Sequence, residues 1–381
     1  METESIHCIN CITGETGVLS FKREKMRETG IAKPMGKELF YGPGLIDIQI
    51  NGIMGIDFNV PTVSVDDMIK ATHHLLADGV TTYFPTVITN SDEHILRIIS
   101  TIASACEENS LVADCVGGIH LEGPFISPQP GARGAHSEAY VKAPDWELFM
   151  KFQKAAGGRI KIVTLAPEWE EAPDFIRNCT ESGVIVSIGH SLANTDQVRT
   201  AVAAGARMST HLGNGIPLMI QRHPNLIWDQ LAEDNLYSCI IADGIHIPDA
   251  FIKVVQKVKG NNLMIVSDAT CFAGMEPGEY QTHIGGYVVL EKNKRLSVKG
   301  GLGILAGAAK TIRENVETLL DHDLFDLSTA WQMATGNVEA FLSNCGKEIQ
   351  IGLEDYTIFS VQHSAVRVEK VVKKGSLVFE K

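Results

Sequence analysis

Side chains that can bind a metal ion or move a proton recur where an apolar stretch of the chain gives way to a Gly-, Ser- or Asn-rich loop. They are Glu122, His190, His211, His246 and Asp268. A single histidine at such a point is more often a structural hydrogen-bonding residue than a ligand. Repetition of the pattern at several separate stretches indicates instead a shared site, built where those stretches end.

The residue types in this set suit one another. Two imidazoles and a carboxylate, here His190, His211 and Glu122, form a three-ligand set for a divalent metal and leave a fourth position open for water. Such a metal lowers the pKa of its water from 15.7 to about 7. Asp268 would act first as general base and then as general acid, a contribution of ~10²–10⁴-fold. His120, on the same strand face as Glu122, is expected to support the site, with a ligand role as the alternative.

Eight apolar stretches alternate with helical segments and would position these residues. The stretches are 44–50, 80–88, 116–123, 160–167, 184–190, 207–212, 237–244 and 263–269. This alternation predicts an α/β fold, a closed (β/α)₈ TIM barrel, in which catalytic groups lie at the C-terminal ends of the strands. An eight-stranded doubly wound sheet is the alternative architecture. The first helix is predicted over 63–79, with Ser64 as its N-cap.

The two ends of the chain depart from this pattern. Residues 1–42 and 345–381 are expected to pair as a small β-sandwich domain, because neither segment has enough apolar surface to form a core alone. Residues 43–344 form the predicted barrel domain. Within it, residues 278–299 resemble an inserted hairpin, and residues 302–320 have the apolar spacing of a core-packing helix.

Composition excludes several classes of protein. The chain has 381 residues, 44% of them hydrophobic, and a net charge of −13, which makes nucleic acid an unfavourable partner. No apolar run approaches the roughly 20 residues of a membrane span, and the first residues do not resemble a signal peptide. The eight cysteines are scattered and are expected to be reduced. These features predict a soluble, globular, cytoplasmic enzyme.

Six motifs in a fixed order carry a resemblance to a known family. They are HLEGPFISP (120–128), GARGAH (131–136), GHSLA (189–193), THLGNG (210–215), IADGIH (241–246) and SDAT (267–270). The series resembles that of the N-acetylglucosamine-6-phosphate deacetylases, which belong to the amidohydrolase superfamily. The resemblance implies metal-dependent removal of the acetyl group from N-acetylglucosamine 6-phosphate, with glucosamine 6-phosphate and acetate as products.

The resemblance also implies roles for individual residues. Glu122, His190 and His211 would bind one divalent metal per chain, Zn²⁺ with Fe²⁺ or Co²⁺ as alternatives, and Asp268 would be the catalytic acid and base. The substrate would contact Ala135, His136, Asn214, Gly215, Arg222, His246, Leu305, Ala306 and Gly307.

Within that substrate set, the 6-phosphate would be held by Arg222 and His246. In the family this arginine reaches across from a second subunit, so a homodimer is implied.

Two departures from the family pattern bear on metal and substrate. Gln49 and Asn51 stand where many amidohydrolases have a His-x-His pair, so one metal rather than two is expected. Gly213 and Gly215 remove side-chain bulk beside the substrate and leave its identity open. The alternatives are a related or unphosphorylated N-acetyl amino sugar, or a cyclic amide. A catalytically silent sugar-binding relative would have lost Asp268 or a ligand, and none is lost.

Overall fold

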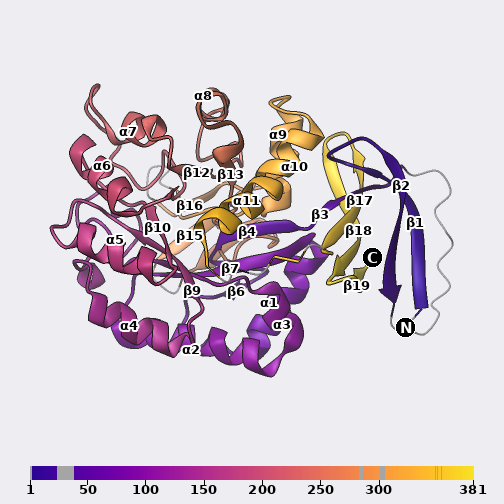
Figure 1. Ribbon diagram of the computed structural model, residues 1–381, viewed down its shortest axis with the longest axis horizontal. Helices are drawn as coiled ribbons and strands as arrows, with labels where there is room; N and C mark the ends of the chain where they lie inside the picture. Colours follow the sequence, from indigo (N-terminus) through magenta and orange to yellow (C-terminus); the bar gives the residue numbers. More distant parts are fainter. Residues whose placement is uncertain are drawn as a thin grey trace.

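The computed structural model describes residues 2–23, 38–282, 286–300, 305–347, 349, 351–352 and 354–381. Its elements form a large parallel barrel surrounded by helices and a small β domain beside it, which contains both ends of the chain (Figure 1).

Eight parallel strands form the large barrel in chain order, each hydrogen-bonded to the next. They are β4 (Leu45–Ile50), β7 (Val80–Ile88), β8 (Ile119–Glu122), β9 (Ile160–Leu165), β10 (Ile185–Ile188), β11 (Met208–Ser209), β12 (Tyr237–Ile240) and β13 (Leu263–Ile265). The last strand meets the first through a parallel bridge between Ile50 and Ala269 and a 2.9 Å hydrogen bond from the Asp268 N–H to the Gln49 carbonyl. The predicted (β/α)₈ barrel is confirmed, and the doubly wound alternative is wrong.

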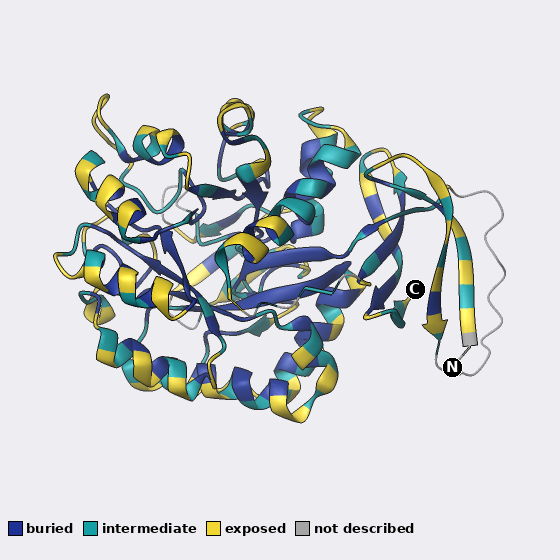
Figure 2. Ribbon diagram, viewed as in Figure 1, coloured by how far each residue is buried: buried dark blue, intermediate teal, exposed yellow. Residues whose placement is uncertain are grey.

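The helices cover the outside of the barrel. They are α1 (Val65–Ala77), α2 (Asp92–Glu108), α3 (Ser110–Cys115), α4 (Trp146–Ala155), α5 (Ala172–Glu181), α6 (Thr195–Ala204), α7 (Leu226–Ala232), α8 (Asp249–Lys259), α9 (Ile312–Asp321), α10 (Leu327–Met333) and α11 (Gly336–Cys345), with 3₁₀ turns η1 (Glu138–Tyr140) and η2 (Gly260–Asn262). In α2 the buried residues Ile95, Ile98, Ile99 and Ile102 recur at helical spacing. Each helix therefore turns one buried face to the strands and an exposed face outward (Figure 2).

Local sequence signals set where helices begin. The predicted cap Ser64 accepts a hydrogen bond from the Asp67 N–H, and the Asp67 carboxylate accepts one from the Ser64 N–H. The same reciprocal pair of Thr311 and Glu314 begins α9 at Ile312. The predicted helical start at residue 302 is therefore wrong for residues 305–311. Residues 302–304 lie outside the described part of the chain.

The small domain draws its strands from both ends of the chain. They are β1 (Glu2–Asn10), β2 (Thr16–Arg23), β3 (Phe40–Pro43), β17 (Tyr356–Gln362), β18 (Ala365–Lys373) and β19 (Ser376–Glu380). Their pairing closes into a small barrel around buried Phe21, Ile358 and Val372. Residues 24–37 of the predicted domain lie outside the described residues, and its exact boundaries stay a prediction.

The small domain packs against the N-terminal end of the large barrel. The Trp331 ring stacks on Phe359 of β17, with 4.2 Å between centroids. The ammonium of Lys373, on β18, donates to the Thr81 carbonyl at 2.8 Å and to the Asp355 carboxylate at 2.6 Å. Because Thr81 is near the start of β7, this junction lies at the opposite end of the barrel from the C-terminal ends of the strands.

Two short antiparallel sheets lie above the C-terminal ends of the strands. Strands β14 (Gly278–Gln281), β15 (Tyr287–Leu290) and β16 (Leu296–Val298) form one, and β5 (Gly52–Ile53) with β6 (Ile56–Asp57) form the other. The predicted insertion at 278–299 is thus a three-stranded sheet, with residues 283–285 outside the described part. Among the helices that the structure describes, none has the length and apolar character to cross a lipid bilayer.

Candidate metal centre and active site

A cavity of about 580 Å³ opens at the C-terminal ends of the barrel strands. Apart from Arg222, every residue predicted from the sequence to act in the site lines it. These are Glu122, Ala135, His136, His190, His211, Asn214, Gly215, His246, Asp268, Leu305, Ala306 and Gly307. The barrel thus brings together residues that are far apart in the chain.

Three of the predicted ligand atoms converge at one point in the cavity. Oε1 of Glu122 lies 3.3 Å from Nε2 of His190 and 3.1 Å from Nε2 of His211. The two Nε2 atoms are 3.1 Å apart. All three side chains are buried. Two imidazole nitrogens and a carboxylate oxygen that face one another at these distances form a donor set that fits a divalent cation.

The hydrogen bonds around this cluster leave Nε2 of His190 available as a ligand. Nδ1 of His190 is 2.9 Å from the Ala132 carbonyl, which can only accept a hydrogen bond, so the proton resides on Nδ1. Nδ1 of His211 is buried and has no partner among the described residues. A hydrogen bond on the far nitrogen fixes which imidazole atom faces a metal, and here it does so for His190.

Burial and mutual contact shift the pKa values within the cluster. Burial alone would raise the pKa of Glu122, but the contacts with the imidazoles of His190 and His211 outweigh it and hold the pKa well below its usual range. Burial would lower the pKa of His211, but the hydrogen bond to Glu122 and the charge of Glu122 raise it. The carboxylate is therefore ionised and concentrates negative charge where the ligand atoms meet.

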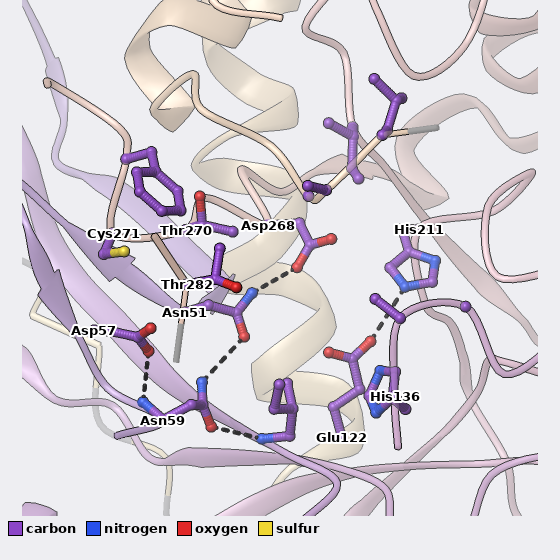
Figure 3. Close-up of a pocket in the computed structure, with 18 of the residues that line it drawn as sticks. Asn51, Asp57, Asn59, Glu122, His136, His211, Asp268, Thr270, Cys271 and Thr282 are labelled. Carbon is purple, nitrogen blue, oxygen red and sulfur yellow. Dashed lines mark hydrogen bonds and ion pairs between the residues drawn. The ribbon is translucent and has the colours of Figure 1, made fainter. Parts of the chain in front are cut away.

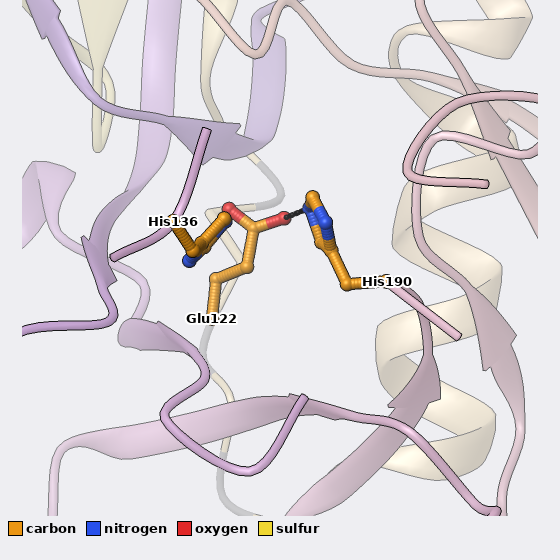
Figure 4. A group of neighbouring side chains, drawn as sticks. All are labelled: Glu122, His136 and His190. Carbon is orange, nitrogen blue, oxygen red and sulfur yellow. Dashed lines mark ion pairs between the residues drawn. The ribbon is translucent and has the colours of Figure 1, made fainter. Parts of the chain in front are cut away.

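His136 lies closer to the metal cluster than its predicted substrate role suggests. A potential ligand nitrogen of His136 lies within 4.8 Å of ligand atoms of Glu122 and His190 (Figure 4). Its Nδ1 is 2.8 Å from the Thr89 hydroxyl, which leaves Nε2 to face the cluster. Burial, and then the charge of His190, lower the pKa of His136 to about 3, so the ring is neutral. Sequence reasoning missed this proximity, although the GARGAH motif placed His136 in the site.

His120 does not face the cavity as a ligand would. Its Nδ1 is 2.9 Å from the Ile48 carbonyl and its Nε2 is 2.7 Å from the Thr164 hydroxyl. Both ring nitrogens are therefore engaged inside the barrel, and burial lowers the pKa of the ring. The geometry agrees with the expected supporting position and leaves no nitrogen for a metal.

The backbone is left-handed at three of the functional positions. His190, His211 and Asp268 have φ values of 49°, 28° and 47°. A non-glycine residue in this region costs of order 1–3 kcal/mol and persists only where its surroundings enforce it. Each lies just after a strand, so the turn there directs the side chain into the cavity.

Two amides hold Asp268. Its Oδ1 accepts a hydrogen bond from the Asn51 amide at 2.8 Å (Figure 3) and another from the Gln49 amide at 3.2 Å. The Gln49 amide also donates to Oε1 of Glu122 at 3.0 Å. Burial, and then the charge of Glu122, raise the pKa of Asp268 to about 6. A carboxyl with such a pKa can accept a proton at neutral pH and return it.

The two residues expected to bind phosphate lie apart. His246 lines the cavity, and its Nδ1 is 2.7 Å from the Asp243 carboxylate. Arg222 is exposed, and it lies in a loop that also exposes Leu218 and Met219. It is not one of the described residues that line the cavity. A single chain therefore brings His246 but not Arg222 to the cavity.

Comparison with known proteins gives relatives that match most of the chain. An N-acetylglucosamine-6-phosphate deacetylase of Bacillus subtilis (strain 168) is 35% identical over 275 residues, which are 71% of this chain and 67% of that protein. One of Mus musculus is 33% identical over 349 residues, 89% of this chain and 83% of that protein. An N-acetylgalactosamine-6-phosphate deacetylase of Shewanella sp. (strain ANA-3) is 32% identical over 306 residues, 78% and 73% of the two chains.

Solved structures agree with the sequence comparison. The crystal structure of N-acetylglucosamine-6-phosphate deacetylase from Pasteurella multocida has a TM-score of 0.79 at 26% identity and covers 98% of this chain and 99% of that one. No protein-family model matches the chain.

Proposed function

The chain belongs to the N-acetylglucosamine-6-phosphate deacetylase family of the amidohydrolase superfamily, and from that premise we propose that it removes the acetyl group of N-acetylglucosamine 6-phosphate. It is an amide hydrolase, and its products are glucosamine 6-phosphate and acetate. The observation that carries the proposal is the meeting of Oε1 of Glu122 with Nε2 of His190 and of His211 in the cavity that Asp268 also lines.

One divalent metal ion per chain is proposed at this meeting point. Glu122, His190 and His211 would hold it, and we favour Zn²⁺, with Fe²⁺ and Co²⁺ compatible with the same donors. When bound, such an ion polarises the amide carbonyl and lowers the pKa of water to about 7. Gln49 and Asn51 offer neutral amides where a second ion would need imidazoles, which supports a single ion.

Asp268 performs the proton transfers. It takes a proton from the attacking water as the bond from water oxygen to acetyl carbon forms. It returns that proton to the amine nitrogen as the carbon–nitrogen bond breaks. Its pKa, raised to about 6 by burial and the charge of Glu122, suits both steps.

Several other residues of the cavity would bind the sugar. His136 and Ala135 would lie against the sugar and its N-acetyl group, and Asn214 and Gly215 would also contact the substrate. The same cavity includes Leu305, Ala306 and Gly307, which would complete its wall.

We assign the 6-phosphate to His246 and to Arg222 of a second copy of the chain, which makes a homodimer part of the proposal. The exposure of Arg222 supports this, because a guanidinium that does not reach its own cavity is free to reach another. A guanidinium binds phosphate oxygens in a bidentate manner.

Arg222→Ala should therefore raise KM for the phosphorylated sugar far more than for the unphosphorylated one. Equal losses on both substrates would contradict the phosphate contact.

The test of the proposed function is acetate release from N-acetylated hexosamines with and without a 6-phosphate, measured on the metal-loaded protein. The largest kcat/KM should belong to N-acetylglucosamine 6-phosphate. N-acetylgalactosamine 6-phosphate is the second candidate, because one relative is named for it. A cyclic amide hydrolysed faster than every N-acetyl sugar would overturn the proposal.

All eight cysteines are free thiols, which supports a cytoplasmic location.

A further inference from the structure

A row of buried amides leads from the backbone of β7 to Asp268. Asn59, which follows β6 and is 2% exposed, lies beside Asn51, and Asn51 contacts Asp268 (Figure 3). Asn59 lies outside the six motifs named above and has no role in the mechanism above. Because it is buried without touching a metal ligand in any described contact, its position calls for a physical explanation.

Two backbone groups of β7 fix the orientation of the Asn59 side chain. Its Oδ1 accepts a hydrogen bond from the Ile88 N–H at 2.8 Å. Its Nδ2 donates to the Thr86 carbonyl at 3.0 Å. A backbone N–H can only donate and a carbonyl can only accept, so the amide of Asn59 cannot be reversed. Its second Nδ2 proton is thereby directed to Oδ1 of Asn51, 3.5 Å away.

The fixed orientation passes along the row to the carboxylate. With its Oδ1 occupied by Asn59, the Asn51 amide turns its Nδ2 to Oδ1 of Asp268, at 2.8 Å. The Gln49 amide donates to the same oxygen. Among the described residues, the side-chain donors to Asp268 therefore meet at Oδ1, and Oδ2 is left for the reacting groups.

We propose that Asn59 is a positioning residue, which acts through Asn51 to hold Oδ1 of Asp268 and so presents Oδ2 as the oxygen that takes and returns the proton. The inference rests on the proposed function, because it requires Asp268 to be the acid and base. Asn59 contributes orientation only: it touches neither the metal ligands nor the reacting atoms.

A double-mutant cycle separates this role from a purely structural one. Asn51→Leu removes the charge-assisted hydrogen bond to Asp268 and should lower kcat about 10-fold. Asn59→Leu acts only through Asn51 and should lower kcat by no more than that factor. KM and metal content should stay near those of the unmodified enzyme. Because both changes break the same row, the double variant should have the kcat of Asn51→Leu alone.

The control is a capping asparagine far from the cavity. The Asn109 side chain accepts from the Val112 N–H at 3.0 Å and caps α3. Asn109→Ala should lower the melting temperature and leave kcat unchanged. If Asn59→Leu does not fold, Asn59→Ala takes its place in the same cycle.

The possible outcomes test the role of Asn59 and the role of Asp268 separately. The positioning role would be overturned if the two losses of kcat multiplied in the double variant. It would also be overturned if Asn59→Leu changed only the melting temperature and KM. Asp268→Asn, measured in parallel, tests the proposed function itself: if that variant keeps its turnover, Asp268 is not the acid and base. If its turnover falls while the cycle shows no coupling, the role of Asn59 alone is refuted.

Discussion

Two buried polar clusters at opposite ends of the large barrel differ in how fully their hydrogen-bonding groups are satisfied. At the junction with the small domain, the Lys373 ammonium donates to the Asp355 carboxylate, the Thr81 carbonyl and the Thr82 hydroxyl, so its donors are satisfied within the chain. At the C-terminal end, two imidazole nitrogens lie 3.1 Å apart, and Nδ1 of His211 and Oε1 of Gln49 have no partner in the described part of the chain.

The cluster around Lys373 stabilises the fold, whereas the cluster in the cavity has hydrogen-bonding and ligand atoms that a bound ligand would satisfy. Removal of one partner from a buried ion pair is strongly destabilising, because it leaves the other charge buried and unpaired. A buried cluster that lacks partners and has a left-handed backbone costs free energy in every unliganded molecule. We therefore expect changes at the two ends to affect different measurements.

Removal of the proposed metal ion should have the largest effect. Chelation should abolish acetate release and lower the melting temperature, because the proposed ion would satisfy the converging atoms of Glu122, His190 and His211. Zn²⁺ at about 100 times its Kd should restore about 2.7 kcal/mol of stability. Metal analysis should find about one ion per chain. A melting temperature that does not respond to chelator, or two ions per chain, would contradict the cluster as described.

Asp268→Asn should lower turnover by ~10²–10⁴-fold, because the amide cannot accept the proton. Metal content and melting temperature should remain close to those of the unmodified protein. Turnover and metal content are measured on the same preparation. Near-normal turnover would remove Asp268 from the mechanism.

Lys373→Met should lower stability and leave turnover intact, the reverse of what is expected for Asp268→Asn. It leaves the Asp355 carboxylate buried and unpaired, which costs about 3–5 kcal/mol of unfolding free energy, while kcat of the folded fraction stays unchanged. The neighbouring Lys374→Met is the matched control. Lys374 pairs with Asp114 but its side chain is 55% exposed, so its loss should cost no more than about 1 kcal/mol. Equal costs measured by denaturant unfolding would show that burial of the pair is irrelevant.

Asp47→Asn should change the slope of stability against pH. Burial raises the pKa of Asp47 to about 7 in the folded protein, above the value of about 3.9 in an unfolded chain. The stability from its protonated form is therefore present in full below pH ~4 and is lost as the pH rises towards 7. The introduced amide would be a permanent mimic of that form, so Asp47→Asn should flatten unfolding free energy between about pH 4 and 7. An unchanged slope would contradict the raised pKa.

The sequence predicted what depends on periodicity and strand ends. The strand at 80–88 is β7 as observed, and the strand-end positions of Glu122, His190, His211 and Asp268 follow from the barrel. Such predictions succeed because a parallel barrel brings every strand end to one rim.

What the sequence left out depends on contacts between distant segments. Gln49 and Asn51 were interpreted only as lost ligands, although their amides hold Asp268. The start of α9 was misplaced, because apolar spacing continues through residues 305–307, whose real place is the cavity wall. No role was predicted for Asn59, since its proposed role arises from the backbone of another strand.

The small barrel also has a consequence for how the protein is made. Its strand β2 pairs with β19, and β3 pairs with β17, so strands synthesised first receive partners that leave the ribosome last. Until then β2 and β3 have open edges, which invite pairing with other chains. A chain shortened before residue 356 would keep those edges open permanently, and we expect it to accumulate as aggregate even though every residue of the cavity has been made.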